Sequence, residues 1–269
     1  MTNEDILLQL QSRKYNPEYI PPTDYKVLTI GNKLIGSLQN YVCFTGLPKT
    51  GKSTFLSSLV ASAVHPGDFF GLKLNMPDNR KKLCYIDTES SDHDFYRQME
   101  RIRSFLDINR IPPSIEAFAV REDNHKTIIS YIDTYLTITP ECSVIIIDGL
   151  LDLIINYNDE AESRQLIQWL KTITKKYNIL VITVIHLGKK DNQTLGHLGS
   201  ACDRYAQSTL LIEKDKEQQC FTISSRFMRS DEDFEPISIK YFNGKYELYN
   251  YEQRPDMPKK KGSSSKAGS

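Results

Sequence analysis

The 269-residue sequence has no apolar run close to the roughly 20 residues that a bilayer-spanning helix needs, and its first residues carry no signal-peptide pattern. Its five cysteines form no Cys-x-x-Cys pair and show no zinc-ligand spacing. These absences argue against a membrane protein and a zinc finger. They favour a cytoplasmic protein whose cysteines are buried free thiols.

An excess of charge of one sign is also missing, because 34 Lys and Arg residues balance 34 Asp and Glu residues. This balance argues against a histone-like protein coated in positive charge, although basic residues confined to a pore can still contact nucleic acid. Hydrophobic residues make up 39% of the chain, which is enough for a sizeable core and excludes a disordered protein.

Residues 46–54 read Gly-Leu-Pro-Lys-Thr-Gly-Lys-Ser-Thr and satisfy the phosphate-loop pattern G-x-x-x-x-G-K-[ST]. An apolar run before the loop predicts a strand, and apolar residues at helical spacing after it predict a helix. Such a loop points its backbone N–H groups and the positive end of the helix dipole at one place, so we expect it to bind ATP. The residues expected to contact the nucleotide are Gly46, Pro48, Lys49, Thr50, Gly51, Lys52, Ser53 and Thr54. Lys52 adds a charge for the β- and γ-phosphates, and Ser53 adds a hydroxyl ligand for Mg²⁺.

Strand-like and helix-like patterns alternate from residue 39 to about residue 213. Continuous β-branched runs at residues 83–86, 144–147 and 180–185 predict an α/β fold with a mostly parallel central sheet, flanked by helices on both faces. After residue 207 the strand-like runs follow one another without a helix, and Asn243-Gly244 is typical of a hairpin turn. We expect these C-terminal strands to be antiparallel and to extend the same sheet.

The chain is expected to divide into three parts. Residues 1–38 predict an arm with a short amphipathic helix and an extended lead-in, because prolines interrupt any longer helix. Residues 39–250 are expected to form the ATPase domain. The lysine-rich and serine-rich residues 251–269 predict a flexible basic tail.

A carboxylate follows the apolar run 144–147, and this Asp148 is expected to hold Mg²⁺ beside the phosphate loop, although a strand-ending aspartate is also a common turn former. Gly149 follows it in place of a second acid, so another group must orient the attacking water. Glu89 is the favoured group and Asp87 is its competitor. A role in capping a helix that starts near residue 92 is the alternative for Glu89.

His186 ends the run 180–185 and should reach the same edge of the sheet. A neutral imidazole at this edge can hydrogen-bond the γ-phosphate and distinguish ATP from ADP. A packed or surface histidine without a role in the site is the alternative. The expected catalytic set within one chain is therefore Lys52, Glu89 and His186.

Together these residues resemble the RecA-like ATPases, and within them the RepA and DnaB type of hexameric replicative helicase of plasmids and mobile elements. The resemblance rests on the phosphate loop, Asp87-Thr88-Glu89, Ile147-Asp148-Gly149-Leu150, His186-Leu187-Gly188-Lys189 and residues 195–201. It implies a RecA-like core, a homohexameric ring with ATP at each subunit interface, single-stranded DNA through its centre, and primase or another replication protein as a partner. It also implies an arginine supplied in trans, for which Arg226 matches best and Arg229 is the second choice.

The resemblance further implies two DNA-contacting loops, whose counterparts here are residues 151–159 and 189–203. The second offers Lys189, Lys190 and His197 for phosphate oxygens, and its lack of aromatic residues favours contact with the backbone over base stacking. Two other functions compete with a motor: a DNA-binding switch that recruits a partner enzyme without unwinding, and a small-molecule kinase built on the same loop. The sequence has no lid-like arginine-rich segment, which argues against the kinase.

Overall fold

The computed structural model describes residues 2–19, 24–65, 69–188, 194–242 and 245–249. The helices are α1 (Asn3–Gln11), α2 (Lys52–Ser62), α3 (Asp92–Leu106), α4 (His125–Ile138), α5 (Glu160–Tyr177) and α6 (Gly196–Tyr205), with a 3-10 turn, η1, at Leu150–Leu153. The strands are β1 (Lys26–Ile30), β2 (Lys33–Ser37), β3 (Tyr41–Gly46), β4 (Leu72–Leu74), β5 (Lys82–Asp87), β6 (Ile115–Ala119), β7 (Cys142–Asp148), β8 (Leu180–His186), β9 (Ser208–Asp215), β10 (Cys220–Met228), β11 (Ile237–Phe242) and β12 (Lys245–Leu248). In this described part of the chain, no helix combines the length and the apolar character that crossing a membrane requires.

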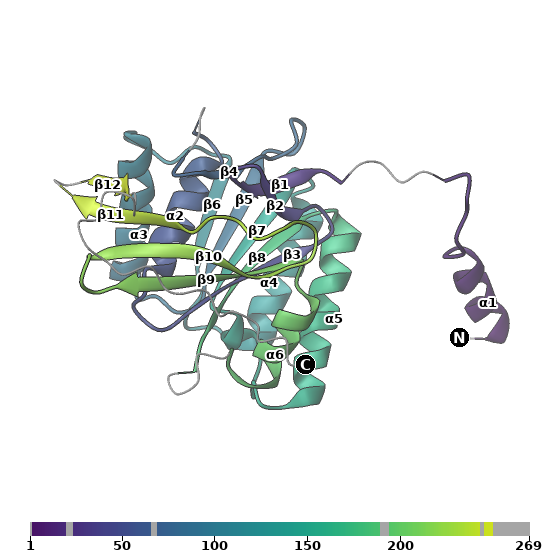
Figure 1. The fold of residues 1–269 in the computed structure, drawn as a ribbon. Helices are drawn as coiled ribbons and strands as arrows, with labels where there is room; N and C mark the ends of the chain where they lie inside the picture. Colours follow the sequence, from purple (N-terminus) through teal and green to yellow (C-terminus); the bar gives the residue numbers. More distant parts are fainter. Residues whose placement is uncertain (1, 20–23, 66–68, 189–193, 243–244, 250–269) are drawn as a thin grey trace, which may run out of the picture.

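A nine-stranded sheet forms the centre of the molecule, with its strands in the order β12-β11-β10-β9-β3-β8-β7-β5-β6 (Figure 1). The strands from β9 to β6 are parallel, and β10, β11 and β12 extend the sheet as antiparallel strands. The predicted α/β fold class, with antiparallel C-terminal strands on a mostly parallel sheet, is therefore confirmed. The expected turn at residues 243–244 and the expected tail at residues 251–269 lie outside the described residues.

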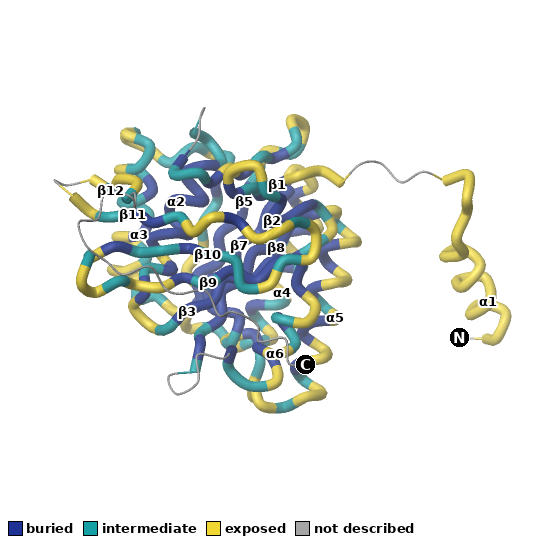
Figure 2. Tube along the Cα trace, in the orientation of Figure 1, coloured by how far each residue is buried: buried dark blue, intermediate teal, exposed yellow. Residues whose placement is uncertain are grey.

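Successive residues of the central strands face two separate apolar cores. In β3, Val42 and Phe44 pack with α2 and α3, whereas Tyr41 and Cys43 pack with α4, α5 and α6. Every residue of β3 and β7 is buried, and Figure 2 shows this buried centre in dark blue. All five cysteines are buried and free, as the sequence predicts. Strands covered on both faces are apolar along their whole length, so the sequence alone located them.

Residues 26–37 differ from the sequence-based expectation of an arm that reaches residue 38. They form β1 and β2, which join β4 in a three-stranded antiparallel sheet of order β2-β1-β4. Val27, Leu28 and Ile35 are fully buried in the core that also contains α2. The body of the protein therefore begins near Lys26. Strands this short offer too few alternating positions for a sequence pattern to separate them from loops.

Arg80 ties together the amino ends of β7 and β8. Its guanidinium donates hydrogen bonds to four backbone carbonyl oxygens, those of Pro140 (3.0 Å), Asn178 (2.7 Å), Tyr177 (2.8 Å) and Cys142. This clamp lies at the amino edge of the sheet, opposite the edge where the phosphate loop, Asp87, Asp148 and His186 are found.

Candidate functional site

The phosphate loop lies between the end of β3 and the start of α2, as the sequence predicts. Gly51 is the N-cap of α2 and has a φ of 92°, a left-handed conformation that favours glycine. A Cβ at Gly51 would also lie 2.4 Å from the ring of Phe221 on β10. The shape of the loop thus depends on a glycine that the sequence pattern contains and on an aromatic ring that the pattern does not include.

Lys52 is buried and turns back into the loop. Its Nζ donates hydrogen bonds to the carbonyl oxygens of Gly46 at 3.1 Å and Leu47 at 2.7 Å. Burial lowers the pKa of Lys52, and the nearby carboxylates of Glu89 and Asp148 oppose this shift. The structure therefore brings the loop lysine and these two carboxylates within electrostatic range of one another.

The other loop residues expected to contact the nucleotide differ in exposure. Exposed side chains belong to Pro48, Lys49 and Ser53, and buried ones to Thr50 and Thr54. The Thr50 hydroxyl donates a hydrogen bond to the Leu47 carbonyl oxygen at 2.8 Å, so it stabilises the loop itself. Ser53, in the first turn of α2, is an exposed residue that a ligand can reach.

Asp148 ends β7 at the carboxyl edge of the sheet and pairs in register with Asp87 of β5. The Tyr85 hydroxyl donates a hydrogen bond to Asp148 Oδ2 at 2.5 Å and accepts one from the Gln98 amide of α3. Tyr85 and Gln98 are both buried. Burial raises the pKa of Asp148 to about 7, the Tyr85 hydrogen bond opposes that shift, and the carboxylates of Asp87 and Glu89 add to it.

Asp87 and Glu89, the two competing candidates after β5, have different partners. Asp87 Oδ1 accepts hydrogen bonds from the backbone N–H groups of Glu89 at 3.0 Å and Ser90 at 2.8 Å, so this oxygen holds the turn after the strand. The N-cap of α3 is Ser91, whose side chain accepts the hydrogen bond of Asp94 N. The capping alternative for Glu89 is therefore wrong.

The Glu89 side chain instead meets His186 of β8. His186 Nε2 lies 3.2 Å from Glu89 Oε1 and 3.3 Å from Oε2. His186 Nδ1 is buried and has no hydrogen-bond partner among the described residues. A proton on Nδ1 would have no acceptor, so the contact favours the tautomer that carries its proton on Nε2. The His186 hydrogen bond lowers the pKa of Glu89, which keeps the carboxylate ionised at neutral pH.

Thr88 and Asp152 adjoin the site, although the sequence analysis assigned neither a role. The Thr88 hydroxyl lies 2.7 Å from Asp152 Oδ2 and 3.0 Å from the carbonyl oxygens of both Asp148 and Gly149. It thereby connects the turn after β5 to the turn after β7. An acid four residues after Asp148 is a signal that could have identified Asp152. The roles of Tyr85 and Gln98 left no such signal, because their contact depends on the packing of α3.

Arg226 lies on β10 where the pairing with β9 is irregular. Its Nη2 is 3.5 Å from Asp203 Oδ2 of α6 in the same chain. Arg226 also lines a cavity of about 640 Å³ together with Leu47, Pro48, Lys49 and Thr50 of the phosphate loop. Arg229, the second choice, is exposed. Arg226 thus lines a cavity together with the phosphate loop of its own chain.

The candidate DNA-binding residues are described only in part. Lys189 and Lys190 lie outside the described residues. His197 is exposed on α6, so the second expected loop differs from expectation in that its later part is helical. The helix forms there because Leu198 and Cys202, four residues apart, are buried in the core shared with α5.

The residues at the carboxyl edge fit a magnesium ion that binds together with a nucleotide. Asp148 and Ser53 offer the hard oxygen ligands that Mg²⁺ prefers, and Asp87 Oδ2 is buried without a hydrogen-bond partner in the described structure. Across the described ranges, no group of three or more His, Cys, Asp or Glu side chains could hold a metal by itself. A small set of protein oxygens suits Mg²⁺ when phosphates and water complete its shell.

Comparison with known proteins identifies the family. A family model described as an AAA domain matches residues 33–192, more than half of the chain, and this range includes the phosphate loop, Glu89, Asp148 and His186. No curated protein matches the sequence. The chain therefore belongs to the AAA domain family of P-loop ATPases.

Proposed function

We propose that this protein is an ATP-hydrolysing RecA-like motor that acts on single-stranded DNA as a homohexameric ring, of the RepA and DnaB helicase type that serves a plasmid or mobile element. The observation that carries the proposal is the contact of Glu89 with His186, within electrostatic range of Lys52. An ionised carboxylate that is partly exposed and does not cap a helix is suited to activate water.

The phosphate loop binds the nucleotide in this proposal. Lys52 leaves the carbonyl oxygens of Gly46 and Leu47 and pairs with the β- and γ-phosphates, next to the N–H groups at the start of α2. Ser53 and Asp148 would hold Mg²⁺, which would neutralise phosphate charge. Tyr85 keeps the Asp148 carboxylate oriented, because its buried hydroxyl donates a hydrogen bond to Asp148 Oδ2.

Glu89 and His186 act on the water in the hydrolytic step. Glu89 accepts a proton from the water that attacks the γ-phosphorus, and the bond to the β-phosphate oxygen breaks to leave ADP and phosphate. His186 orients the Glu89 carboxylate before the reaction. The same Nε2–H can instead donate its hydrogen bond to the γ-phosphate of ATP. ADP has no γ-phosphate, so His186 distinguishes the ATP-bound state from the ADP-bound state.

Arg226 completes the site of a neighbouring subunit. Within its own chain it lies beside Asp203, and it would exchange this carboxylate for the γ-phosphate of the neighbour when a ring forms. A trans arginine contributes a rate factor on the order of 10³–10⁵. His197, with Lys189 and Lys190, contacts the DNA backbone, and repetition around a ring strengthens a patch that is weak in one copy.

The neutral net charge favours a second candidate, an ATP-dependent switch that binds DNA and recruits a partner such as primase without unwinding. Steady-state ATP hydrolysis with and without single-stranded DNA, on protein whose mass is measured in the same buffer, separates the two. Strong stimulation in a hexamer-sized particle, followed by strand separation, supports the motor. Stimulation without strand separation supports the switch, and no hydrolysis at all contradicts both.

Variants assign the roles of individual residues. Lys52→Ala should abolish turnover, and Glu89→Gln should leave ATP bound but not hydrolysed. Normal hydrolysis by Glu89→Gln would transfer the role to Asp87. Arg226→Ala should still bind nucleotide yet be inactive, and mixing it with Lys52→Ala should restore part of the turnover at interfaces that pair two intact halves. Failure to restore any turnover argues against a trans arginine.

A further inference from the structure

Thr88 lies directly before Glu89 and is held at two points by the turn that follows β7. Its N–H donates a hydrogen bond to the carbonyl oxygen of Asp148 at 3.1 Å. Its hydroxyl lies 2.7 Å from Asp152 Oδ2 and 3.0 Å from two backbone carbonyl oxygens. A hydroxyl has a single proton to donate, and a hydrogen bond to a charged acceptor is shorter and stronger than one to a neutral acceptor. The contact of the Thr88 hydroxyl with Asp152 is therefore the favoured one.

Three side chains converge over Gly149, the N-cap residue of η1. A Cβ at this glycine would lie 2.1 Å from Thr88 Oγ1, 2.8 Å from Glu89 Cγ and 3.0 Å from Asp152 Oδ2. The three side chains thus approach the backbone closely at a position where no side chain opposes them. Glu89 and Asp152 therefore lie side by side over the same backbone position.

Two contacts restrain the position of Glu89, and they act at different places. His186 Nε2 lies 3.2 Å from Glu89 Oε1, at the end of the side chain. The hydrogen bond between Thr88 and Asp152 acts instead on the backbone from which the Glu89 side chain extends. In the proposed mechanism His186 donates to the γ-phosphate once ATP binds, so the contact with His186 is given up. The contact between Thr88 and Asp152 involves no atom that the nucleotide engages in that mechanism, so it remains.

The contact between Thr88 and Asp152 also crosses from one strand to the next. It joins the turn after β5, which carries Glu89, to η1, which follows β7 and Asp148. In the proposed mechanism Glu89 acts on the attacking water and Asp148 on Mg²⁺, so the two acids must keep a fixed separation around the γ-phosphate. A misplacement of about 1 Å can cost about 100-fold in rate. A hydrogen bond that ties the two turns together is therefore expected to affect the rate of hydrolysis.

We propose that Asp152 is a positioning residue for ATP hydrolysis: through the Thr88 hydroxyl it holds Glu89 in place relative to Asp148. The inference rests on the proposed role of Glu89 and extends it to two residues that the sequence patterns left without a role. Asp152 is exposed, whereas Thr88 is buried. A change at Asp152 therefore tests the contact without disturbing the packing of the core.

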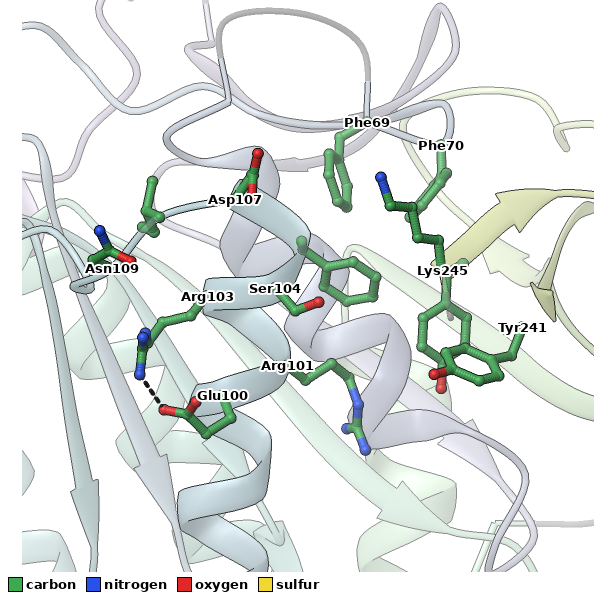
Figure 3. A pocket seen from close by; sticks show the side chains of 13 residues that line it. Phe69, Phe70, Glu100, Arg101, Arg103, Ser104, Asp107, Asn109, Tyr241 and Lys245 are labelled. Atoms are coloured by element: carbon green, nitrogen blue, oxygen red, sulfur yellow. Dashed lines mark hydrogen bonds and ion pairs between the residues drawn. The ribbon is translucent and has the colours of Figure 1, made fainter. Parts of the chain in front are cut away.

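A cavity elsewhere in the molecule supplies a control. It has a volume of about 780 Å³ and lies between the end of α3 and β12, and its wall includes the ion pair of Arg103 with Glu100 (Figure 3). None of the residues that line this cavity belongs to the phosphate loop or to the turns after β5, β7 and β8. Glu100→Ala therefore removes a partly exposed carboxylate and its hydrogen bond without changing the site.

Steady-state ATP hydrolysis by variants of the whole chain tests the proposal. Asp152→Ala and Thr88→Val should each lower kcat by about 10–100-fold and leave KM for ATP unchanged. Because both changes act through one hydrogen bond, the double variant should be no slower than the slower single variant. Thr88→Ser keeps the hydroxyl and should recover most of the rate that Thr88→Val loses. Glu100→Ala should keep the wild-type kcat.

Hydrogen exchange adds a measurement that does not depend on hydrolysis. The backbone N–H groups of Glu89 and Ser90 donate to Asp87 Oδ1, so their exchange reports how firmly the turn after β5 is held. Without nucleotide, Asp152→Ala should speed this exchange by about tenfold or more, and the control variant should not. This measurement decides whether Asp152 holds the turn even if the protein hydrolyses no ATP.

The opposite results overturn the proposal. Wild-type kcat in Asp152→Ala, additive losses in the double variant, or unchanged hydrogen exchange each contradicts it. A raised KM with unchanged kcat also contradicts it, because Asp152 would then act in nucleotide binding. Glu89→Gln separates this failure from that of the proposed function. If Glu89→Gln still hydrolyses ATP, the proposed role of Glu89 fails, whereas an inactive Glu89→Gln beside a fully active Asp152→Ala overturns only the positioning role.

Discussion

Replacing Tyr85 with phenylalanine removes one oxygen from the centre of the site. This hydroxyl donates to Asp148 Oδ2 at 2.5 Å and accepts from Gln98. Phenylalanine keeps the ring, so the packing of this fully buried side chain changes little. A hydrogen bond to a charged group, worth about 1.5–3 kcal/mol, is lost, and the buried Gln98 amide is left without its acceptor.

We therefore expect Tyr85→Phe to lower the free energy of unfolding by about 2–3 kcal/mol at a pH above the pKa of about 7 of Asp148, where this carboxyl is ionised, without Mg²⁺ or nucleotide. Denaturant unfolding followed by circular dichroism measures this loss. The Asp148 carboxylate is also held less firmly, so the Mg²⁺ concentration that gives half-maximal ATP hydrolysis should rise about 10–100-fold. A magnesium titration of the ATPase rate measures this second effect.

Tyr41→Phe is the matched control for this experiment. Tyr41 is another buried tyrosine of the central sheet, but its hydroxyl has no hydrogen-bond partner among the described residues. Its removal should leave both measurements unchanged or stabilise the fold slightly. If Tyr85→Phe loses no more stability than Tyr41→Phe and keeps the wild-type magnesium requirement, the view that Tyr85 positions Asp148 is refuted.

Three further changes test other parts of the structure. Gly149→Ala should lower the free energy of unfolding by more than about 2 kcal/mol, because φ is 113° and the new Cβ would lie 2.1 Å from Thr88 Oγ1. Asp148→Asn should remove a pH dependence of unfolding measured without Mg²⁺ or nucleotide. Burial raises the pKa of Asp148 from 3.8 to about 7, so the folded state binds the proton of this carboxyl more tightly than the unfolded state does. Protonation of Asp148 therefore stabilises the folded state fully below about pH 4, and this contribution to the free energy of unfolding is lost as the pH rises through 7. Arg80→Lys should cost about 2–4 kcal/mol in denaturant unfolding, because an ammonium group lacks the planar fork that reaches four carbonyl oxygens.

Each of these changes has an outcome that contradicts its reasoning. Gly31→Ala is the control for Gly149→Ala, since Gly31 has a φ of 56° and no atom within 4 Å of an added Cβ; equal losses at both glycines rule out the contact with Thr88. A constant difference in stability between wild type and Asp148→Asn from pH 4 to pH 8 rules out the raised pKa. Wild-type stability of Arg80→Lys rules out the guanidinium as a clamp.

Strands with both faces buried were predictable from the sequence, and partly covered ones were not. β7 and β8 are unbroken apolar runs because helices cover both of their faces. β6 is only partly buried and carries a mixed pattern, so periodicity alone did not reveal it. β1 and β2 are short strands that belong to a second sheet, and their pattern resembles that of a loop.

The sequence also identified the carboxylates near the site but left the partners of each one open. Asp87, Glu89 and Asp148 all follow apolar strands, and a linear pattern does not separate a turn former from a solvent-facing acid. Their contacts differ because the register of β5 against β7 sets Asp87 opposite Asp148, and β8 brings His186 to Glu89.

What the sequence by itself determined is local: the phosphate loop, whose residues are consecutive, and the continuous apolar strands of the central sheet. Their physical requirements, glycine conformation and burial on both faces, act over a few neighbouring residues. Only the tertiary structure decided that Tyr85 meets Asp148, that Phe221 packs over Gly51 and that α1 stays outside the body. Each of these depends on strand register or helix packing between segments far apart in the chain, and no short pattern records such a contact.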